Sequence, residues 1–84
     1  MSFDREYTEV GDYITANVTG AMNVSNCNLM MVGYSQSGAV TFATMSENST
    51  VSGTVAKNTE TVKVMLWDNN MMPVIGDEVI TVSQ

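Results

Sequence analysis

The stretch Thr61-Val62-Lys63-Val64-Met65-Leu66-Trp67-Asp68 decides the fold of this chain. Its side chains alternate between two sides of an extended backbone, and one of the two sides is aliphatic from Val62 to Leu66. An alternation with a period of two residues is typical of a strand that has a core on one face. We predict a central strand whose inner face is formed by Val62, Val64 and Leu66. The residues pointing the other way are then Lys63, Met65 and Trp67.

Further runs rich in Val, Thr, Ile and Tyr surround this segment, separated by clusters of Gly, Asn, Ser and Asp. Branched and aromatic side chains favour strands, and the residues between the runs favour turns. No window shows the three- and four-residue apolar spacing of a helix. The pattern predicts an all-β, antiparallel sandwich of about seven strands. The expected strands are 7–10, 13–19, 29–34, 39–45, 50–56, 61–67 and 78–83.

Size and charge limit the classes of protein that the chain can belong to. Its 84 residues suffice for one small domain, 1–84, in which 1–12 is a candidate extended N-terminal arm. The acids near this end are either solvated or docked on a basic neighbour. The net charge is −6 and only three residues are basic, which argues against binding to nucleic acid or to anionic lipid.

Side chains suited to catalysis or metal binding are scarce. The chain has no histidine, and its single cysteine, Cys27, has no partner for an internal disulfide. Nucleophilic catalysis therefore lacks a histidine base, and zinc lacks its usual ligands. Asp68 and Asp77 either supply oxygen atoms to a calcium ion or are solvated loop acids, and their spacing matches no EF-hand. We expect a protein that is not an enzyme and uses no cofactor.

Two stretches carry a family resemblance. Leu66-Trp67-Asp68 is followed by Met72-Pro73-Val74, and Val32-Gly33-Tyr34 leads through a polar turn to Gly38-Ala39-Val40. This arrangement resembles small immunoglobulin-like modules in surface and secreted proteins of Gram-positive gut bacteria, although Met72 stands where those modules usually have lysine. The resemblance implies an immunoglobulin-like β-sandwich with a non-catalytic role. Similar domains are common as decoration and fibre modules of tailed phages.

The expected role is that of a structural or interaction module in a larger assembly. The first residues, 1–6, do not read as a secretory signal, and no apolar run is long enough to span a membrane. We therefore expect a virion protein, a capsid decoration or a tail or fibre component, made in the host cytoplasm. Its partners would be capsid or tail subunits and copies of itself. The alternative is an excised cell-surface module for adhesion or carbohydrate binding, with surface-layer subunits or glycans as partners.

Candidate contact residues lie in the last loop, in the last strand and among the aromatic residues. The loop is apolar and either contacts a partner or packs on the core. The first and last strands are the expected sheet edges, which can accept a partner strand. Trp67 either closes one end of the sandwich or stacks with Tyr34 on a sugar ring. The full set is Met71, Met72, Pro73, Ile80, Val82, Trp67 and Tyr34.

Overall fold

Strands make up the regular structure of this protein. The computed structural model describes residues 2–18, 27–68 and 73–83, and within these ranges it gives the backbone alone for Cys27, Asp68 and 73–77. The described part contains eight strands and no helix, which confirms an all-β protein. The strands are β1 (Ser2–Phe3), β2 (Thr8–Glu9), β3 (Tyr13–Asn17), β4 (Cys27–Tyr34), β5 (Val40–Ser46), β6 (Thr50–Thr54), β7 (Thr61–Asp68) and β8 (Pro73–Ser83).

The expected strands differ from the observed ones mainly at the two ends of the chain. β1 was not predicted, because a strand of two residues shows no periodicity. β8 starts at Pro73, whereas the expected last strand starts at residue 78. Proline is tolerated as the first residue of a strand, where its missing N–H costs little. Gly38 lies in the turn expected between strands 29–34 and 39–45, and it has a φ of 88°, which glycine adopts readily.

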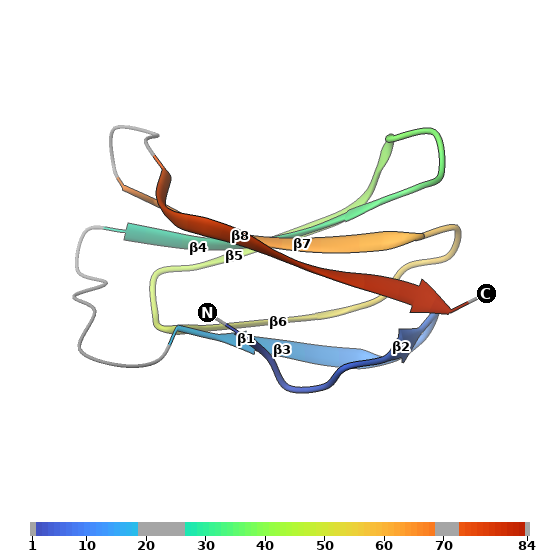
Figure 1. Ribbon diagram of the computed structural model, residues 1–84, viewed down its shortest axis with the longest axis horizontal. Coiled ribbons are helices and arrows are strands. Elements are labelled where there is room, and N and C mark those ends of the chain that lie inside the picture. The colour runs from blue at the N-terminus through green and yellow to red at the C-terminus, as the bar shows by residue number, and fades with distance from the viewer. Residues whose placement is uncertain (1, 19–26, 69–72, 84) are drawn as a thin grey trace.

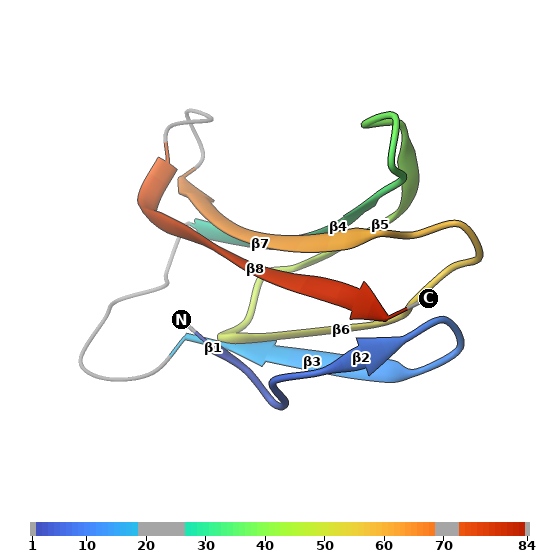
Figure 2. The same cartoon turned by 45° about the vertical axis from the view of Figure 1, so that its right-hand side comes forward.

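Two sheets pack face to face (Figure 1). One sheet has the order β1-β3-β6 and the other has the order β2-β8-β7-β4-β5. All strand pairs are antiparallel except β2 with β8, which is parallel. The five-stranded sheet is strongly curved, and both the hairpin between β4 and β5 and the start of β8 rise away from the other sheet (Figure 2).

The core lies between the sheets and uses the predicted face of β7. Val62, Val64 and Leu66 are fully buried, which confirms their assignment to the inner face. The neighbouring strand β4 places its own inward residues opposite them in register, namely Gly33, Met31 and Leu29. The three-stranded sheet closes the core from the other side with Ile14, Ala16 and Val51.

Gly33 shapes the junction between β4 and β5. A Cβ atom at this position would overlap the ring of Phe42, which lies directly across from Gly33 in the register. The absent side chain therefore lets the phenyl ring lie over the β4 backbone and pack against the core. The register shifts just beyond this pair, between Gly33 and Tyr34, so the irregularity is confined to the hairpin end of β5.

The N-terminal segment joins both sheets. β1 pairs with β3 in one sheet, and β2 pairs with the end of β8 in the other. Segment 1–12, the candidate arm, thus runs along one side of the sandwich. β2 is a sheet edge, as expected for the first strand. The last strand, β8, is an edge only in part, because β2 pairs with its end at Val82 and Ser83.

Replacing Val64 with alanine tests the inner face of β7. Because the change removes two fully buried methyl groups and leaves a cavity, we expect the free energy of unfolding to fall by about 2–3 kcal/mol in a denaturant titration. Val79→Ala on the adjacent strand is the matched control. The Val79 side chain is 52% exposed, so we expect a loss below about 1 kcal/mol. Equal losses would contradict the assignment of the two faces.

Candidate functional site

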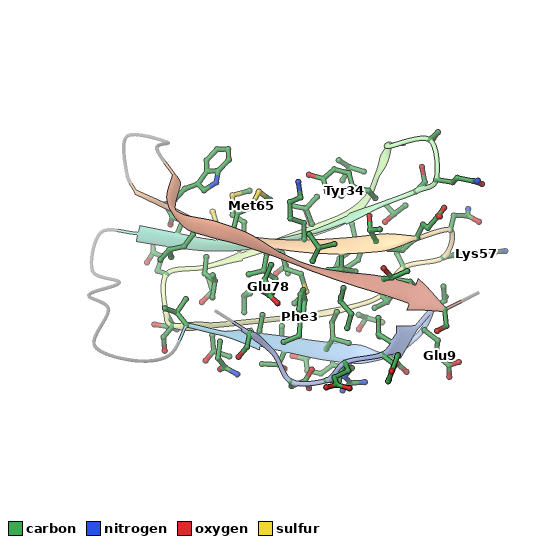
Figure 3. The ribbon with its side chains drawn as sticks, in the orientation of Figure 1. Phe3, Glu9, Tyr34, Lys57, Met65 and Glu78 are labelled. Carbon is green, nitrogen blue, oxygen red and sulfur yellow. The ribbon has the colours of Figure 1, made fainter. Side chains whose placement is uncertain are left out.

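Three methionines form a row across the five-stranded sheet. Met30 of β4 pairs with Met45 of β5 on one side and with Met65 of β7 on the other. The neighbours of Met30 and Met65 along their strands belong to the core, and on β5 Phe42 packs against the core, so alternation directs this row to the opposite face. We call the surface of the sheet that faces away from the three-stranded sheet the outer face. Figure 3 shows Met65 and Tyr34 on this side.

Apolar residues extend the methionine row on the outer face. In the adjacent row, Val32 pairs with Ala43 on β5 and with Lys63 on β7, and Lys63 pairs with Val79 on β8. Burial falls toward the rim of this surface: Met65 is 9% exposed, whereas Met45 on the outermost strand is 61% exposed. The curvature of the sheet lets side chains near its middle cover one another, and no further strand of the described residues lies over this face.

The two aromatic residues expected to act together are far apart along the sheet. Tyr34 pairs with Thr61 at one end of β7, and Trp67 pairs with Asn28 near the other end. The distance between these positions is about 20 Å, at about 3.3 Å per residue along the strand. The two rings therefore cannot stack on one sugar ring. Tyr34 instead has the ammonium group of Lys63 at 6.0 Å from its ring centroid, within the range of a cation–π contact.

The predicted contact residues of the last strand point inward. Ile80 and Val82 are 5% and 2% exposed and belong to the hydrophobic core. Their side chains are therefore not available to a partner in this structure. Met71 and Met72 lie outside the described residues. Pro73 opens β8 opposite Trp67, so the backbone places these two predicted residues side by side.

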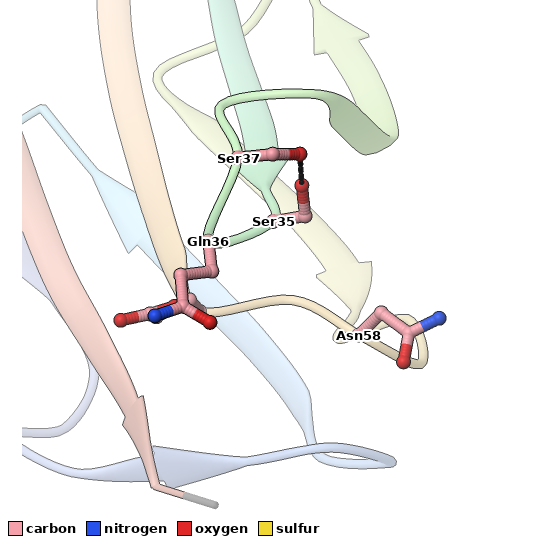
Figure 4. Close-up of a pocket in the computed structure, with 5 residues that line it drawn as sticks. Ser35, Gln36, Ser37 and Asn58 are labelled. Atoms are coloured by element: carbon pink, nitrogen blue, oxygen red, sulfur yellow. Dashed lines mark hydrogen bonds between the residues drawn. The ribbon is translucent and has the colours of Figure 1, made fainter.

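A polar depression lies at the hairpin end of the sheet (Figure 4). It is lined by Ser35, Gln36, Ser37, Asn58 and Glu60. The hydroxyl groups of Ser35 and Ser37 are hydrogen-bonded at 2.9 Å, and the Ser35 hydroxyl also accepts the N–H of Ala39. An adjoining depression shares part of this lining and adds Tyr34 and Lys63. These groups can hydrogen-bond a small polar molecule, but a single carboxylate beside hydroxyls and amides does not make an acid–base pair.

Metal and membrane sites receive no support from the described residues. Among them, no three Asp, Glu, Cys or His side chains are grouped closely enough to hold a metal ion. The possible calcium ligands Asp68 and Asp77 fall outside the described side chains. In the same part of the chain, no helix has the length and apolar character needed to cross a membrane.

A charged cluster fixes the N-terminal segment beside β8. The Arg5 guanidinium lies 3.0 Å from the Asp4 carboxylate and 3.4 Å from that of Asp12. Asp12 also accepts hydrogen bonds of 3.0 Å from the Glu9 N–H and the Thr8 hydroxyl. The hydrogen bond from Arg5 lowers the pKa of Asp4, and those from the Glu9 N–H and the Thr8 hydroxyl lower the pKa of Asp12.

No protein-family model matches the chain, and neither a curated protein nor a solved structure matches it. The function must therefore be argued from the surface. Within the described part, the outer face of the five-stranded sheet brings apolar side chains together in two adjacent rows, with Lys63 among them. The methionines of this face can be found in the sequence, but only the strand register shows that three of them form one row.

The lowered pKa values of Asp4 and Asp12 predict that the N-terminal segment loses stability in acid. Their pKa values are lowered in the fold, so their contribution to stability is complete above the unfolded value of about 3.9 and is lost as pH falls through the lower folded values. We expect the melting temperature of the wild type to drop more steeply below about pH 4 than that of an Asp12→Asn variant. Glu47→Gln, at an exposed site in the turn after β5, is the control for the change in charge. A slope that is unchanged by Asp12→Asn would contradict this role.

Proposed function

We propose that the chain is an immunoglobulin-like interaction module that acts through protein contacts and not through catalysis. The neighbours within its sheets support this class. With β3, β4, β5, β6, β7 and β8 taken as strands B, C, C′, E, F and G, the pairs B–E and the order G–F–C–C′ are those of immunoglobulin domains. The N-terminal strand, divided between the two sheets as β1 and β2, fits position A.

The chain departs from antibody domains in how the two sheets are held together. Those domains have a disulfide between strands B and F, whereas the only cysteine of this chain is Cys27. Here Ala16 of β3 and Val64 of β7 belong to the same buried cluster. Apolar packing holds the layers together in place of a disulfide, as in many sandwich domains that share the architecture without it.

The observation that carries the proposal is the methionine row of the outer face. Methionine is flexible and polarisable, so a surface of methionines can adapt to the shape of a protein partner. An apolar sheet face without a covering layer marks a contact site in a soluble domain. The strongly exposed end of the row, at Met45, is where a partner would gain most by burial.

A virion is the assembly that we propose, with the chain as a capsid decoration, tail or fibre protein and with capsid or tail subunits as partners. The supporting features are the low content of charged residues, 14%, and a surface suited to docking on another protein. The polar depression beside Tyr34 and Lys63 favours a second candidate, glycan binding by a cell-surface module. Its hydroxyl, amide and ammonium groups suit sugar hydroxyls.

Substitution at the exposed end of the row tests the proposal. A Met45→Glu variant should fold normally, because its side chain is 61% exposed, yet it should be incorporated into the native particle at least about tenfold less well, since a charge would be buried in an apolar contact. Tyr13→Glu is the matched control, because Tyr13 is 65% exposed but belongs to the other sheet. Incorporation is measured by quantitative immunoblotting of purified particles. Equal losses, or a loss with Tyr13→Glu alone, would contradict the outer face as the contact.

A photo-crosslinking residue at position 45 identifies the partner in the cells that make the protein. The proposal expects an adduct with a subunit of the particle. Adducts that form from the hairpin position 37 and not from position 45 would instead favour the polar depression. A titration of the chain with simple sugars, followed by amide chemical shifts of Tyr34 and Gln36, tests the glycan alternative directly.

A further inference from the structure

The free side of β5 can be derived from the backbone hydrogen bonds around it. The Glu60 N–H donates to the Tyr34 carbonyl oxygen, so the peptide groups of Tyr34 face β7. Because these groups alternate along a strand, those of Gly33 and Met31 face β5. Their partners Phe42 and Thr44 are then the hydrogen-bonded residues of β5. The N–H and C=O groups of Ala43 and Met45 therefore point away from the sheet, whereas Thr41 is the extra residue of the bulge between the pairs Tyr34–Val40 and Gly33–Phe42.

β5 has β4 as its only strand partner in the described part of the chain. It contains seven residues, Val40–Ser46, without a charge or a proline. Edge strands are usually protected by lysine, proline, bulges or short length. The bulge lies in β5 itself, at its hairpin end, where Thr41 is the extra residue. The part from Phe42 to Ser46 is regular and carries none of these protective features.

The other sheet edges in the described residues are less suited to pairing. β1 and β2 have two residues each, and β2 includes Glu9. β6 has five residues, Thr50–Thr54, and includes Gly53, which weakens a strand. Its outward groups are those of hydroxyl-bearing residues. β8 pairs with β2 only at Val82 and Ser83, and its remaining edge carries Pro73, Asp77 and Glu78. β5 is therefore the edge that combines seven residues with no charge, proline or glycine, and it has exposed apolar side chains at Val40 and Met45.

We propose that β5 pairs with β5 of a second copy of this chain, antiparallel and with the two-fold axis at Ala43. Because the polar groups of Ala43 point outward, the two central alanines form a hydrogen-bonded pair with Cα atoms about 5.5 Å apart. Met45 then lies opposite Thr41 of the partner subunit, and the reverse contact follows by symmetry. The two five-stranded sheets become one continuous sheet, and the methionine rows of both copies lie on the same face of it.

The distribution of charge allows a second copy to meet the domain at this edge. Two copies that each carry a net charge of −6 repel one another, so they can meet only where acids are absent. β5 and the adjoining part of the outer face around Met30 carry no ionisable group, whereas Glu9 on β2 and Glu78 on β8 bring acids to the opposite side. A two-fold contact also occupies the exposed edge of both copies, so no further copy can add to the dimer at this edge. This inference goes beyond the proposed function, which concerns the outer face and another protein.

Sedimentation equilibrium of the purified chain tests the dimer, with two variants of equal charge. Ala43→Lys places two ammonium groups face to face at the axis and should raise the dimer dissociation constant at least about tenfold. Thr54→Lys is the matched control, because Thr54 is exposed on β6, the edge of the other sheet, and it should leave the constant unchanged or lower it slightly. A wild type that is monomeric at millimolar concentration, or equal weakening by both variants, would overturn the proposal.

Crosslinking provides a second measurement that does not depend on weakening the dimer. In a Cys27→Ser background, an Ala43→Cys variant should give covalent dimers with a short bis-maleimide at micromolar protein concentration. Ser37→Cys, at the exposed hairpin, should not. Dimers from the Ser37 variant alone, or ladders of higher oligomers from the Ala43 variant, would also overturn the two-fold β5 contact. Since neither test involves another protein, the outcome is separable from that of the particle experiment.

Discussion

The pairing of β4 with β7 runs over eight consecutive residue pairs without a register shift, and most other features follow from it. Because successive side chains of a strand point to opposite faces, this register assigns every residue of both strands at once. It places Leu29, Met31 and Gly33 against the aliphatic face of β7 in the core. By the same alternation it places Met30 beside Met65 on the outer face. A slip of one residue would exchange the two sets, and the core would then receive Lys63.

The two faces of the five-stranded sheet differ less in polarity than is usual for a small sandwich. Antiparallel sheets commonly have one apolar and one polar face, but here the outer face includes Met30, Val32 and Met65 as well as Lys63. Apolar residues on that face contribute nothing to the contact between the layers, and the chain has no disulfide to compensate for a small core. Val32 and Met65 are buried within the curve of the sheet, so the proposed contact concerns mainly the exposed end of the row at Met45.

Sequence reasoning succeeded where the information is local and failed where it depends on which strands are neighbours. The alternation in 61–67 is local, so the inner face of β7 could be predicted from it. The position of β8 in the sheet depends on contacts between distant segments. Ile80 and Val82 are apolar whether or not β8 is a sheet edge, and only the topology shows that β2 pairs beside them. The distance between Tyr34 and Trp67 likewise depends on the antiparallel register. β1 could not be predicted from the sequence, because a strand of two residues shows no alternation.

The N-terminal segment explains why the two sides of the five-stranded sheet differ. After pairing with β3, the chain crosses to β8, where Arg5 bridges Asp4 and Asp12, and Asp12 in turn binds the backbone of Glu9. This charged cluster holds β2 against the end of β8, so the side that the sequence suggested as open is partly occupied by the chain itself. The opposite side has no comparable segment among the described residues: β5 and β6 are consecutive, and the turn between them leads directly to the other sheet. An open strand edge persists in a soluble protein only if it is protected or used. Because β5 carries neither charge nor proline, use by a second strand is the solution consistent with its sequence.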